Sequence, residues 1–264
     1  MDAAALIAQF GEQQVAGFFL VLSRVSPLFL LAPLFSSRLI PARARAVIAL
    51  GLTVGLTPIA VKASPGEIPL DPIGFAGLIG KEMLVGMAFA YTLAAMFAAI
   101  AVAGSLLDTL IGFSMSALVD PMTGNQATAI NQLYNLVGLG VFIAISGDAW
   151  VIQGLARTYE LVPLLDAPAL GSLVEGTQVA FVQVMTSALQ VCAPVLIAIT
   201  LTDVAFAITS RVVPQLNVFA VGFPAKIAVG LIVVGASLPF VAGWMSDELQ
   251  HTIWDALQSL EVAA

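Results

Sequence analysis

Long apolar stretches with almost no charged residues dominate this sequence. A helix needs about 20 residues to cross the hydrocarbon core of a membrane, and several of these stretches reach or exceed that length. Only 9% of the residues are charged, whereas a soluble domain carries roughly 25%, so the chain has too few ionic groups to cover a water-facing surface. We therefore predict an all-α, polytopic membrane protein with about six hydrophobic helical segments. The stretches lie at about 15–35, 44–61, 73–107, 131–146, 179–210 and 218–245.

The third and fifth stretches are longer than one membrane crossing needs. At 1.5 Å per residue a 35-residue helix reaches about 52 Å, whereas the hydrocarbon core is about 30 Å thick. We expect Pro194 to break the fifth stretch, because the proline ring removes a backbone hydrogen bond and clashes with the preceding turn. The third stretch has no proline after Pro72, so we expect it to extend beyond the bilayer or to begin outside it.

The basic residues predict an orientation in the membrane. Arg38, Arg43 and Arg45 share one short loop, which the positive-inside bias places in the cytoplasm. Six crossings counted from that loop put both chain termini on the outer side. The one strongly polar loop that we expect is 157–178, which mixes charged residues, apolar residues and two prolines.

The sequence offers little for catalysis or for a cofactor. It has one cysteine, Cys192, and one histidine, His251, and a lone histidine away from other metal-binding side chains does not form a metal site. It contains no phosphate-binding glycine loop, no zinc-binding helix motif and no serine elbow. We therefore expect no enzyme, no cofactor, no metal and no nucleic-acid partner.

Asp203 lies within an apolar stretch, where a carboxylate costs about 2.5–3.5 kcal/mol on insertion scales and so usually has a partner or a task. Arg211 is about two helical turns away and about 80° around the axis, which disfavours a direct pair. Lys226 is the alternative partner if the last two stretches form a hairpin that closes near 211–217. We favour a structural ion pair between Asp203 and Lys226, fixing the register of the hairpin, over a proton relay.

Three other charged residues stand near predicted helix ends. Lys81 and Glu82 are adjacent in the sequence, and adjacent residues do not face each other on a helix. Asp108 lies where the third stretch ends. We expect water to solvate all three side chains.

The segment "GFSMSALVDPMTG", residues 112–124, is both apolar and irregular. Its glycines and its Asp-Pro step disfavour a long helix, and irregular backbone at membrane depth occurs only inside protein or beside a water-filled cavity. Methionine is unbranched and can fill an irregular opening, but the composition alone favours an ordinary packed loop over a deformable closure. The residues that would form such a closure are Gly112, Phe113, Met115, Leu118, Val119, Met122 and Gly124.

A series of segments, in order along the chain, resembles the FliR family of export-gate subunits, which serve bacterial flagella and virulence type III secretion systems. The N-terminal segment "FFLVLSRVSPLFLLAPLFSSRLIPARARAVIAL" resembles the opening of that family, including Arg24 in the first helix and the IPAR turn. "GKEMLVGMAF" at 80–89 and "VDPMTGNQ" at 119–126 continue the resemblance, which covers nearly the whole chain. "SRVVPQLNVFAVGFPAKI" at 210–227 is the most specific segment and is similar to flagellar members.

The resemblance implies both an architecture and a function. It implies helical hairpins, with a FliP-like part at 1–178 followed by a FliQ-like hairpin and tail at 179–264. It implies a non-catalytic gate subunit in the bacterial inner membrane, at the flagellar basal body. Such a subunit assembles with FliP and FliQ to pass unfolded flagellar subunits across the membrane. FlhB and FlhA are further expected partners, and membrane lipid is an expected contact.

The resemblance also gives roles to two segments. The segment at 111–125 falls where the family has its plug. Met115 and Met122 would therefore help to close the channel when it is empty and to seal it around a chain that is passing through. The hairpin tip at 211–217 would face the cytoplasm and contact FlhB. The tip residues expected to make this contact are Arg211, Pro214, Gln215 and Asn217.

A secondary transporter is the alternative function, with Asp203 and Lys226 as its coupling site. A transporter of that kind would show two corresponding halves with broken helices, and the sequence shows no such halves. An intramembrane enzyme is a third class, but the sequence offers no arrangement of a nucleophile with a base. The sequence therefore favours the export-gate hypothesis over both alternatives.

Overall fold

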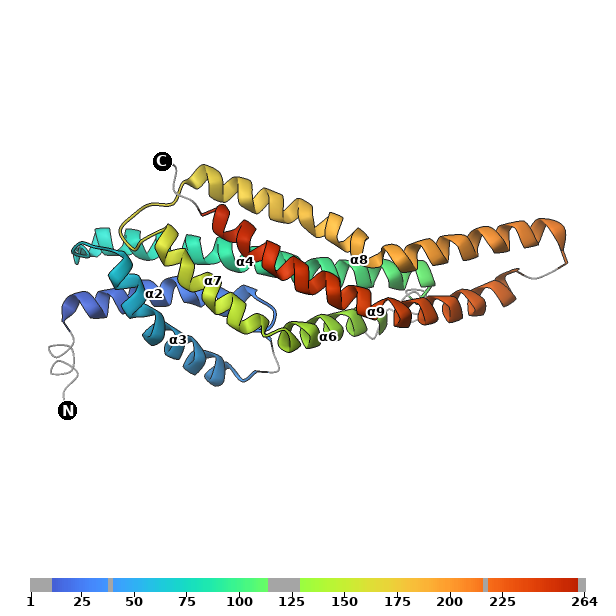
Figure 1. The fold of residues 1–264 in the computed structure, drawn as a ribbon, viewed down its shortest axis with the longest axis horizontal. Helices are drawn as coiled ribbons and strands as arrows, with labels where there is room; N and C mark the ends of the chain where they lie inside the picture. The colour runs from blue at the N-terminus through green and yellow to red at the C-terminus, as the bar shows by residue number, and fades with distance from the viewer. Residues whose placement is uncertain (1–10, 38–39, 114–128, 216–217, 261–264) are drawn as a thin grey trace. The chain divides into compact units, whose positions relative to one another are not determined.

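The computed structural model describes residues 11–37, 40–113, 129–215 and 218–260, and every regular element in these ranges is a helix. The predicted all-α fold is therefore confirmed for the part of the chain that the structure describes. Figure 1 shows the helices in chain order. They are α2 (Glu12–Leu31), α3 (Ala42–Ala63), α4 (Pro72–Ile111), α6 (Ala129–Ala144), α7 (Gly147–Leu161), α8 (Leu170–Val212) and α9 (Val218–Gln258).

Five of the described helices, α2, α3, α4, α8 and α9, are long and apolar enough to cross a membrane. A sixth span results if α6 and α7, which are bent by 70° at their junction, are counted as one. This agrees with the predicted polytopic membrane protein. In α3, α8 and α9 only 22% of the most apolar window is buried within the chain, so much of their apolar surface is left for lipid or for other proteins to cover.

The long helices differ from the prediction at Pro194. The helix α4 is continuous over 40 residues, about 60 Å at 1.5 Å per residue, as its lack of an internal proline predicts. The helix α8 is also continuous over 43 residues and runs through Pro194, so the predicted break is wrong. A proline removes one backbone bond and kinks a helix, and here the buried side chains of Val191 and Val195 on either side keep the helix packed.

The predicted polar loop at 157–178 is also wrong for most of its length. The helix α7 continues to Leu161 and α8 begins at Leu170, so only the short connection between them is not helical. Leu155, Thr158 and Tyr159 are buried while Arg157 and Glu160 are exposed. The mixture of charged and apolar residues that looked like a loop is thus the two faces of an amphipathic helix.

Contacts divide the chain into two compact units, and α4, α8 and α9 each continue from one unit into the other. This division by contacts says nothing about likeness to FliP or FliQ, so the expected parts at 1–178 and 179–264 stay a prediction. Unit 1 comprises Met1–Ala95, Ser146–Phe181 and Leu249–Ala264, and unit 2 comprises Met96–Ile145 and Val182–Glu248.

Unit 1 packs α2 against α3 and against the first part of α4. Val21 and Val25 of α2 and Phe89 of α4 are completely or almost completely buried. A second buried cluster joins segments far apart in the sequence and is formed by Val85, Val162, Leu173 and Leu260, with Ala88 and Leu161 packed against it. Burial of apolar side chains at about 25 cal/mol per Å² is the main force that holds such a cluster together.

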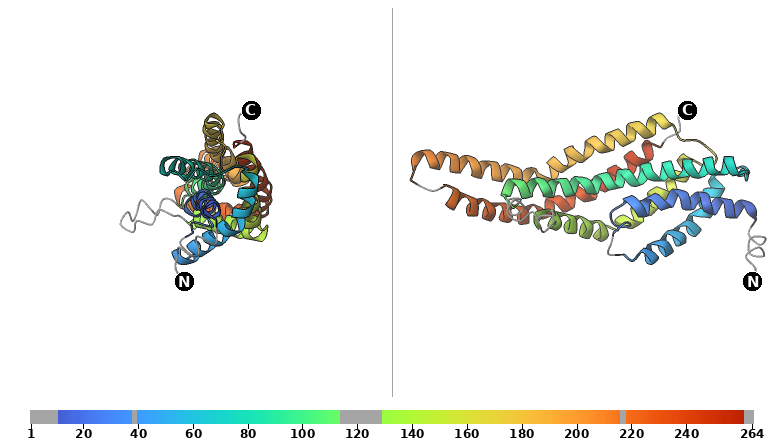
Figure 2. Two further views of the ribbon diagram at one scale, coloured as in Figure 1. Left: turned by 90° about the vertical axis from the view of Figure 1, so that its left-hand side faces the viewer. Right: turned by 180° about the vertical axis from the view of Figure 1, so that it is seen from behind.

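Unit 2 contains two antiparallel helix pairs. The last part of α4 pairs with α6, where the rings of Phe97 and Phe142 meet edge to face with centroids 5.4 Å apart. The helices α8 and α9 form the other pair, which Figures 1 and 2 show running side by side. Trp244 of α9 donates its indole N–H to the Oε1 atom of Gln190 of α8 at 3.3 Å. Both pairs agree with the expected helical hairpins.

Candidate functional site

A buried ion network lies where α2 and α4 cross in unit 1. The guanidinium group of Arg24, on α2, binds the carboxylate of Glu82, on α4, through two hydrogen bonds, from Nε at 2.5 Å and from Nη2 at 3.0 Å. Both side chains are 0% exposed. A guanidinium fork fits the two oxygens of a carboxylate, so this pair fixes the position of α2 along α4.

Arg24 also holds the end of α7. Its Nη1 atom donates to the backbone oxygen of Thr158 at 2.9 Å, and its Nη2 atom donates to the backbone oxygen of Val162 at 2.8 Å. The ring of Tyr159 lies 4.2 Å from the guanidinium carbon, within the range of a cation–π contact. One buried arginine therefore connects α2, α4 and α7, and its Nε, Nη1 and Nη2 atoms all donate hydrogen bonds within this network.

Lys81 adds a second cation to this network. Its ammonium group lies 3.0 Å from a Glu82 oxygen and donates to the backbone oxygens of Leu164 at 2.5 Å and Asp166 at 2.9 Å. The expectation that water solvates Lys81 and Glu82, and that the two do not meet, is therefore wrong. Neighbouring residues point in different directions on a helix, but the long lysine side chain reaches around to the carboxylate that its neighbour presents to Arg24.

A close approach of two backbones makes this network possible. At Gly86, one turn after Glu82 on α4, an added Cβ atom would collide with the backbone oxygen of Arg24. Small residues allow helix backbones to approach in this way. In the sequence, Arg24 was noted only as part of a resemblance, and Glu82 was treated as a solvated charge beside Lys81. The signal that could have paired them is the presence of one cation and one anion inside two separate apolar helices.

Asp108 is buried as well, at 1% exposed, so the expectation that water solvates it is wrong. Its carboxylate accepts hydrogen bonds from the backbone N–H groups of Ile130 at 3.1 Å and Asn131 at 2.8 Å. These are among the first N–H groups of α6, which have no partner within their own helix, and a carboxylate also interacts favourably with the positive end of the helix dipole. Asp108 thus caps α6 from the end of α4.

Asn131 strengthens the same junction. Its side-chain amide donates to the backbone oxygen of Ala101 at 2.9 Å and to the hydroxyl of Ser105 at 2.5 Å. Asp108 and Asn131 together tie the end of α4 to the start of α6. The chain between these two helix ends is the apolar segment singled out in the sequence.

Only the first two residues of the predicted closure lie in the described part of the chain. Gly112 follows α4 with φ +104°, a conformation that glycine adopts readily and other residues rarely do. The ring of Phe223, on α9, occupies the space that a side chain at Gly112 would need. Phe113 comes next and is partly buried. The other predicted closure residues, Met115, Leu118, Val119, Met122 and Gly124, lie outside the described residues.

The structure brings Asp203 and Lys226 together across the α8–α9 pair. The Lys226 ammonium group donates to an Asp203 oxygen at 2.8 Å, and the side chains are 54% and 22% exposed for Asp203 and Lys226. The two charges therefore compensate each other at the surface of the helix pair. Whether the pair fixes the hairpin register stays a prediction.

The residues of the predicted cytoplasmic contact lie at the end of α8. Arg211, Pro214 and Gln215 are exposed, while Asn217 lies outside the described residues. Exposure at the end of a long helix pair leaves these side chains free for a partner. Nothing in the described chain covers them.

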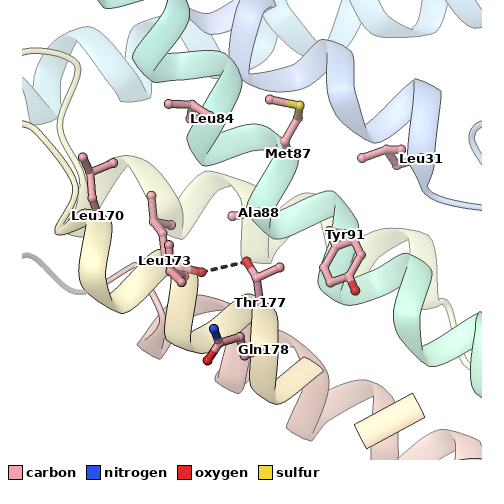
Figure 3. Close-up of a pocket in the computed structure, with 10 residues that line it drawn as sticks. Leu31, Leu84, Met87, Ala88, Tyr91, Leu170, Leu173, Thr177 and Gln178 are labelled. Carbon is pink, nitrogen blue, oxygen red and sulfur yellow. Dashed lines mark hydrogen bonds between the residues drawn. The ribbon is translucent and has the colours of Figure 1, made fainter. Parts of the chain in front are cut away.

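An apolar groove of about 470 Å³ lies in unit 1 between α4 and α8. Figure 3 shows that the hydroxyl of Thr177 is directed to the backbone of its own helix, where it donates to the oxygen of Leu173 at 2.7 Å. The groove therefore offers few polar atoms to a hydrophilic solute. Its lining residues are Leu31, Leu84, Met87, Ala88, Tyr91, Leu170, Leu173, Val174, Thr177 and Gln178.

Metal-binding side chains are not clustered in the described ranges. No three of the His, Cys, Asp and Glu side chains placed there lie close enough to hold a metal ion. The polar groups that the structure does bring together, around Arg24, Asp108 and Asp203, bind one another or the backbone. What this arrangement does is fix helices relative to one another within each unit.

The sequence matches known export proteins over most of its length. A family model described as bacterial export proteins, family 1, matches residues 15–252. The flagellar biosynthetic protein FliR of Bacillus subtilis is 34% identical over 220 residues, which cover 82% of this chain and 84% of that protein. FliR of Escherichia coli K12 is 25% identical over 246 residues, covering 92% and 93%.

A relative from another kind of system also matches. The surface presentation of antigens protein SpaR of Salmonella typhimurium is 25% identical over 222 residues, which cover 83% of this chain and 82% of that protein. The family match includes Arg24, Glu82, Asp108, Asp203 and Lys226 within its limits. The polar contacts described above therefore all fall in the matched region.

Proposed function

Because this chain belongs to the bacterial export proteins, family 1, the family of FliR, and is thereby a component of a flagellar or type III export apparatus, we propose that it is a non-catalytic gate subunit of a flagellar apparatus. It assembles with FliP and FliQ in the bacterial inner membrane, at the flagellar basal body. Unfolded flagellar subunits cross the membrane through the assembled gate. Residues 1–178 supply a FliP-like part, and residues 179–264 supply a FliQ-like hairpin and tail.

The family match over residues 15–252 carries this proposal, and the apolar surface of the helices supports it. Val47 and Val54 of α3 are 69% and 62% exposed, and α8 likewise carries exposed apolar side chains such as Phe181 and Leu201. Large apolar surfaces on a chain mark contacts with lipid or with other proteins. A subunit that meets several neighbours in a membrane needs such surfaces on more than one side.

We assign the gate itself to residues 112–124, with Phe113, Met115 and Met122 closing the passage. A gate for many unrelated sequences should yield to them without reading them through specific hydrogen bonds, and unbranched apolar side chains such as methionine suit that task. The capping of α6 by Asp108, with hydrogen bonds of 2.8 and 3.1 Å, supports this assignment because it gives the segment a fixed base.

Two further contacts complete the proposal. The pair of Asp203 and Lys226 fixes the register of the α8–α9 hairpin, which a 2.8 Å ion pair between the two helices supports. Arg211, Pro214, Gln215 and Asn217, at the tip of the hairpin, contact FlhB on the cytoplasmic side, and FlhA is a further neighbour. A transporter with Asp203 and Lys226 as its coupling site is the less favoured function, because a transporter of that kind would show two corresponding halves with broken helices and the sequence shows no such halves.

Purification from the native host tests the proposal directly. The full chain, extracted with a mild detergent through an affinity tag, should bring FliP and FliQ with it in a complex of constant composition, detected by mass spectrometry. A chain that purifies alone, and that moves a small solute across liposome membranes, would support the transporter instead. Loss of the complex after reversal of charge at Asp203, with restoration by a matching reversal at Lys226, would support the register pair.

A further inference from the structure

The end of α4 packs against α9 at two points within unit 2. Ile111, the last residue of α4, is 0% exposed, and an added Cβ atom at Gly230 would lie 2.8 Å from its side chain. Gly112 follows, and an added Cβ atom there would lie 2.7 Å from the Cε2 atom of Phe223. Two consecutive residues therefore contact α9 at positions about two helical turns apart.

The backbone of Gly112 sets the direction in which the chain leaves α4. Its φ angle is +104°, in a region that glycine adopts readily and other residues rarely do. The ring of Phe223 lies against this glycine and leaves room for a hydrogen atom but not for a methyl group. While the ring stays in place, the backbone at Gly112 cannot turn toward α9.

The contact between Phe223 and Gly112 is one that can be released. Phe223 is 41% exposed, so displacement of its ring removes less buried apolar surface than displacement of Ile111 would. Pro224 comes next, and a proline has no N–H group and crowds the preceding turn of its helix. Residues 218–223 are therefore bound less firmly to the rest of α9, and they follow directly after the hairpin tip at 211–217.

The helix is held in place immediately beyond this weak point. Lys226 donates to an Asp203 oxygen of α8 at 2.8 Å, and Gly230, about one turn further along, packs against the buried side chain of Ile111. A displacement that begins at the hairpin tip is thus confined to the first residues of α9. Phe223 is the last residue of that part.

We propose that Phe223 is a latch for the proposed closure at 112–124. While its ring lies against Gly112, the base of the closure keeps its direction and the passage stays shut. Displacement of the start of α9, by a partner or a force at the hairpin tip, removes the ring and lets the base turn. The inference rests on the proposed function and deepens it, because it names a residue that positions the closure and a way to release it.

A purely structural role for Phe223 predicts a different result. A ring that only stabilises the helix pair lowers the yield of folded, assembled protein when it is removed. A latch instead changes the balance between the closed and the open passage, in complexes that assemble normally. Ion leak through assembled complexes therefore distinguishes the two roles.

The contact itself can be tested without any assumption about export. Gly112→Ala places a methyl group where the ring lies, so it should destabilise the purified chain during unfolding by sodium dodecyl sulfate. In the background of Phe223→Ala the ring is gone, and the effect of Gly112→Ala on the unfolding constant should be smaller by about threefold to tenfold. Equal effects of Gly112→Ala in the two backgrounds would overturn the contact and the latch with it.

Ion leak tests the latch in cells that express the full chain with its accompanying subunits. Phe223→Ala should raise the leak by about threefold to tenfold, the shift expected from loss of the contact of about half a phenyl ring. Phe223→Leu keeps part of the volume and should give an intermediate leak. The matched control is Phe240→Ala, since Phe240 is also a phenylalanine of α9 and is 49% exposed.

Co-purification of the accompanying subunits shows that each of these variants assembles. Equal leaks from Phe223→Ala and Phe240→Ala would overturn the latch, and so would a leak that only follows a loss of assembly. In that case the unfolding experiment decides whether the contact exists at all.

Joint replacement of Met115 and Met122 by alanine separates a failure of the latch from a failure of the gate assignment. A leak from the methionine variant with none from Phe223→Ala would overturn the latch alone. No leak from either variant would overturn the gate assignment and the latch together. A leak from Phe223→Ala alone would support the latch and assign the seal to other side chains of the closure.

A proline variant tests the release step. Pro224→Ala restores a backbone N–H group and should stiffen the start of α9, so that the closed leak stays unchanged while export of flagellar subunits falls by at least about threefold through a smaller open population. Pro239→Ala, at the other proline inside α9, is the matched control and should export normally. Normal export by Pro224→Ala would show that the start of α9 does not have to move, and it would overturn the release step.

Discussion

Replacement of Glu82 by glutamine should weaken the chain far more than any loss of a surface charge. The substitution preserves the size of the side chain but leaves the buried guanidinium group of Arg24 without a counter-ion. It also removes the carboxylate partner of Lys81, which keeps its backbone acceptors Leu164 and Asp166. The loss of stability should therefore come mainly from the unpaired buried charge of Arg24.

The size of the effect follows from burial. Arg24 and Glu82 are both 0% exposed, and removal of one partner from a buried, hydrogen-bonded ion pair costs about 3–5 kcal/mol. We expect about 3 kcal/mol for Glu82→Gln, the lower end of the range, because the amide oxygen still accepts a hydrogen bond. The pair of Asp203 and Lys226 is half exposed, so Asp203→Asn should cost only about 0–1 kcal/mol.

The assay is equilibrium unfolding of the purified chain in mixed micelles with increasing sodium dodecyl sulfate, followed by circular dichroism. Asp203→Asn serves as the matched control, since it also converts one acidic partner of an ion pair to its amide. A double variant, Arg24→Met with Glu82→Met, tests the reason for the effect. Because it leaves neither Arg24 nor Glu82 as an unpaired buried charge, its cost should be well below the sum of the two single variants.

Two results would refute this reasoning. A cost for Glu82→Gln as small as that for Asp203→Asn would mean that the pair is accessible to water and does not hold α2 against α4. The losses of unfolding free energy in Arg24→Met and Glu82→Met could also simply add up in the double variant. Such additivity would mean that the two side chains do not interact. Either result would remove the ion network as the element that organises unit 1.

Three further predictions address the rest of the chain. Gly86→Ala should destabilise by about 1–3 kcal/mol in the same titration, because its methyl group meets backbone, whereas Gly55→Ala, with no neighbour within 4 Å, should not. Asp108→Ala should cost about 1–2 kcal/mol through loss of the α6 cap, and an unchanged unfolding midpoint would argue against the cap. Joint replacement of Met115 and Met122 by alanine should make cells that express the gate leak ions, and unchanged conductance would count against the closure.

The existence of most helices was predictable, because long apolar runs indicate helices in a membrane protein. Their lengths were less so, since α8 begins at Leu170 and α9 ends at Gln258, beyond the apolar runs that predicted them. The contact between Asp203 and Lys226 was also predictable. Both residues lie about two helical turns from the same hairpin turn, so helix geometry places them opposite each other. These features depend on residues that are near one another in the sequence or in one helix. Periodicity and spacing describe such features well.

The ion network was not predictable, because its partners are far apart in the sequence. Arg24 and Glu82 are separated by 58 positions, and the approach of their helices depends on Gly86, whose role only the packed structure reveals. Adjacent charges such as Lys81 and Glu82 look like a solvated helix end when only one helix is considered. Burial from a second helix reverses that interpretation.

The helix α7 was missed for a different reason. Its exposed face carries Arg157 and Glu160, and these charges next to two prolines made the segment look like a polar loop. The continuity of α8 through Pro194 shows the complementary error, because a strong local signal for a break was outweighed by packing on both sides. In both cases tertiary contacts overrode the local pattern.

Crosslinking during export tests the central claim, that this chain lines the passage of an export gate, most directly. A photoreactive amino acid at Phe113, at the start of the proposed closure, would be activated while a flagellar subunit fused to a tightly folded domain is arrested in transit. The same group at Val54, an exposed position of α3, serves as the control. The account predicts a covalent adduct with the arrested subunit from position 113 and none from position 54. Adducts from position 54 alone, or from neither position with lipid as the only product at 113, would contradict it.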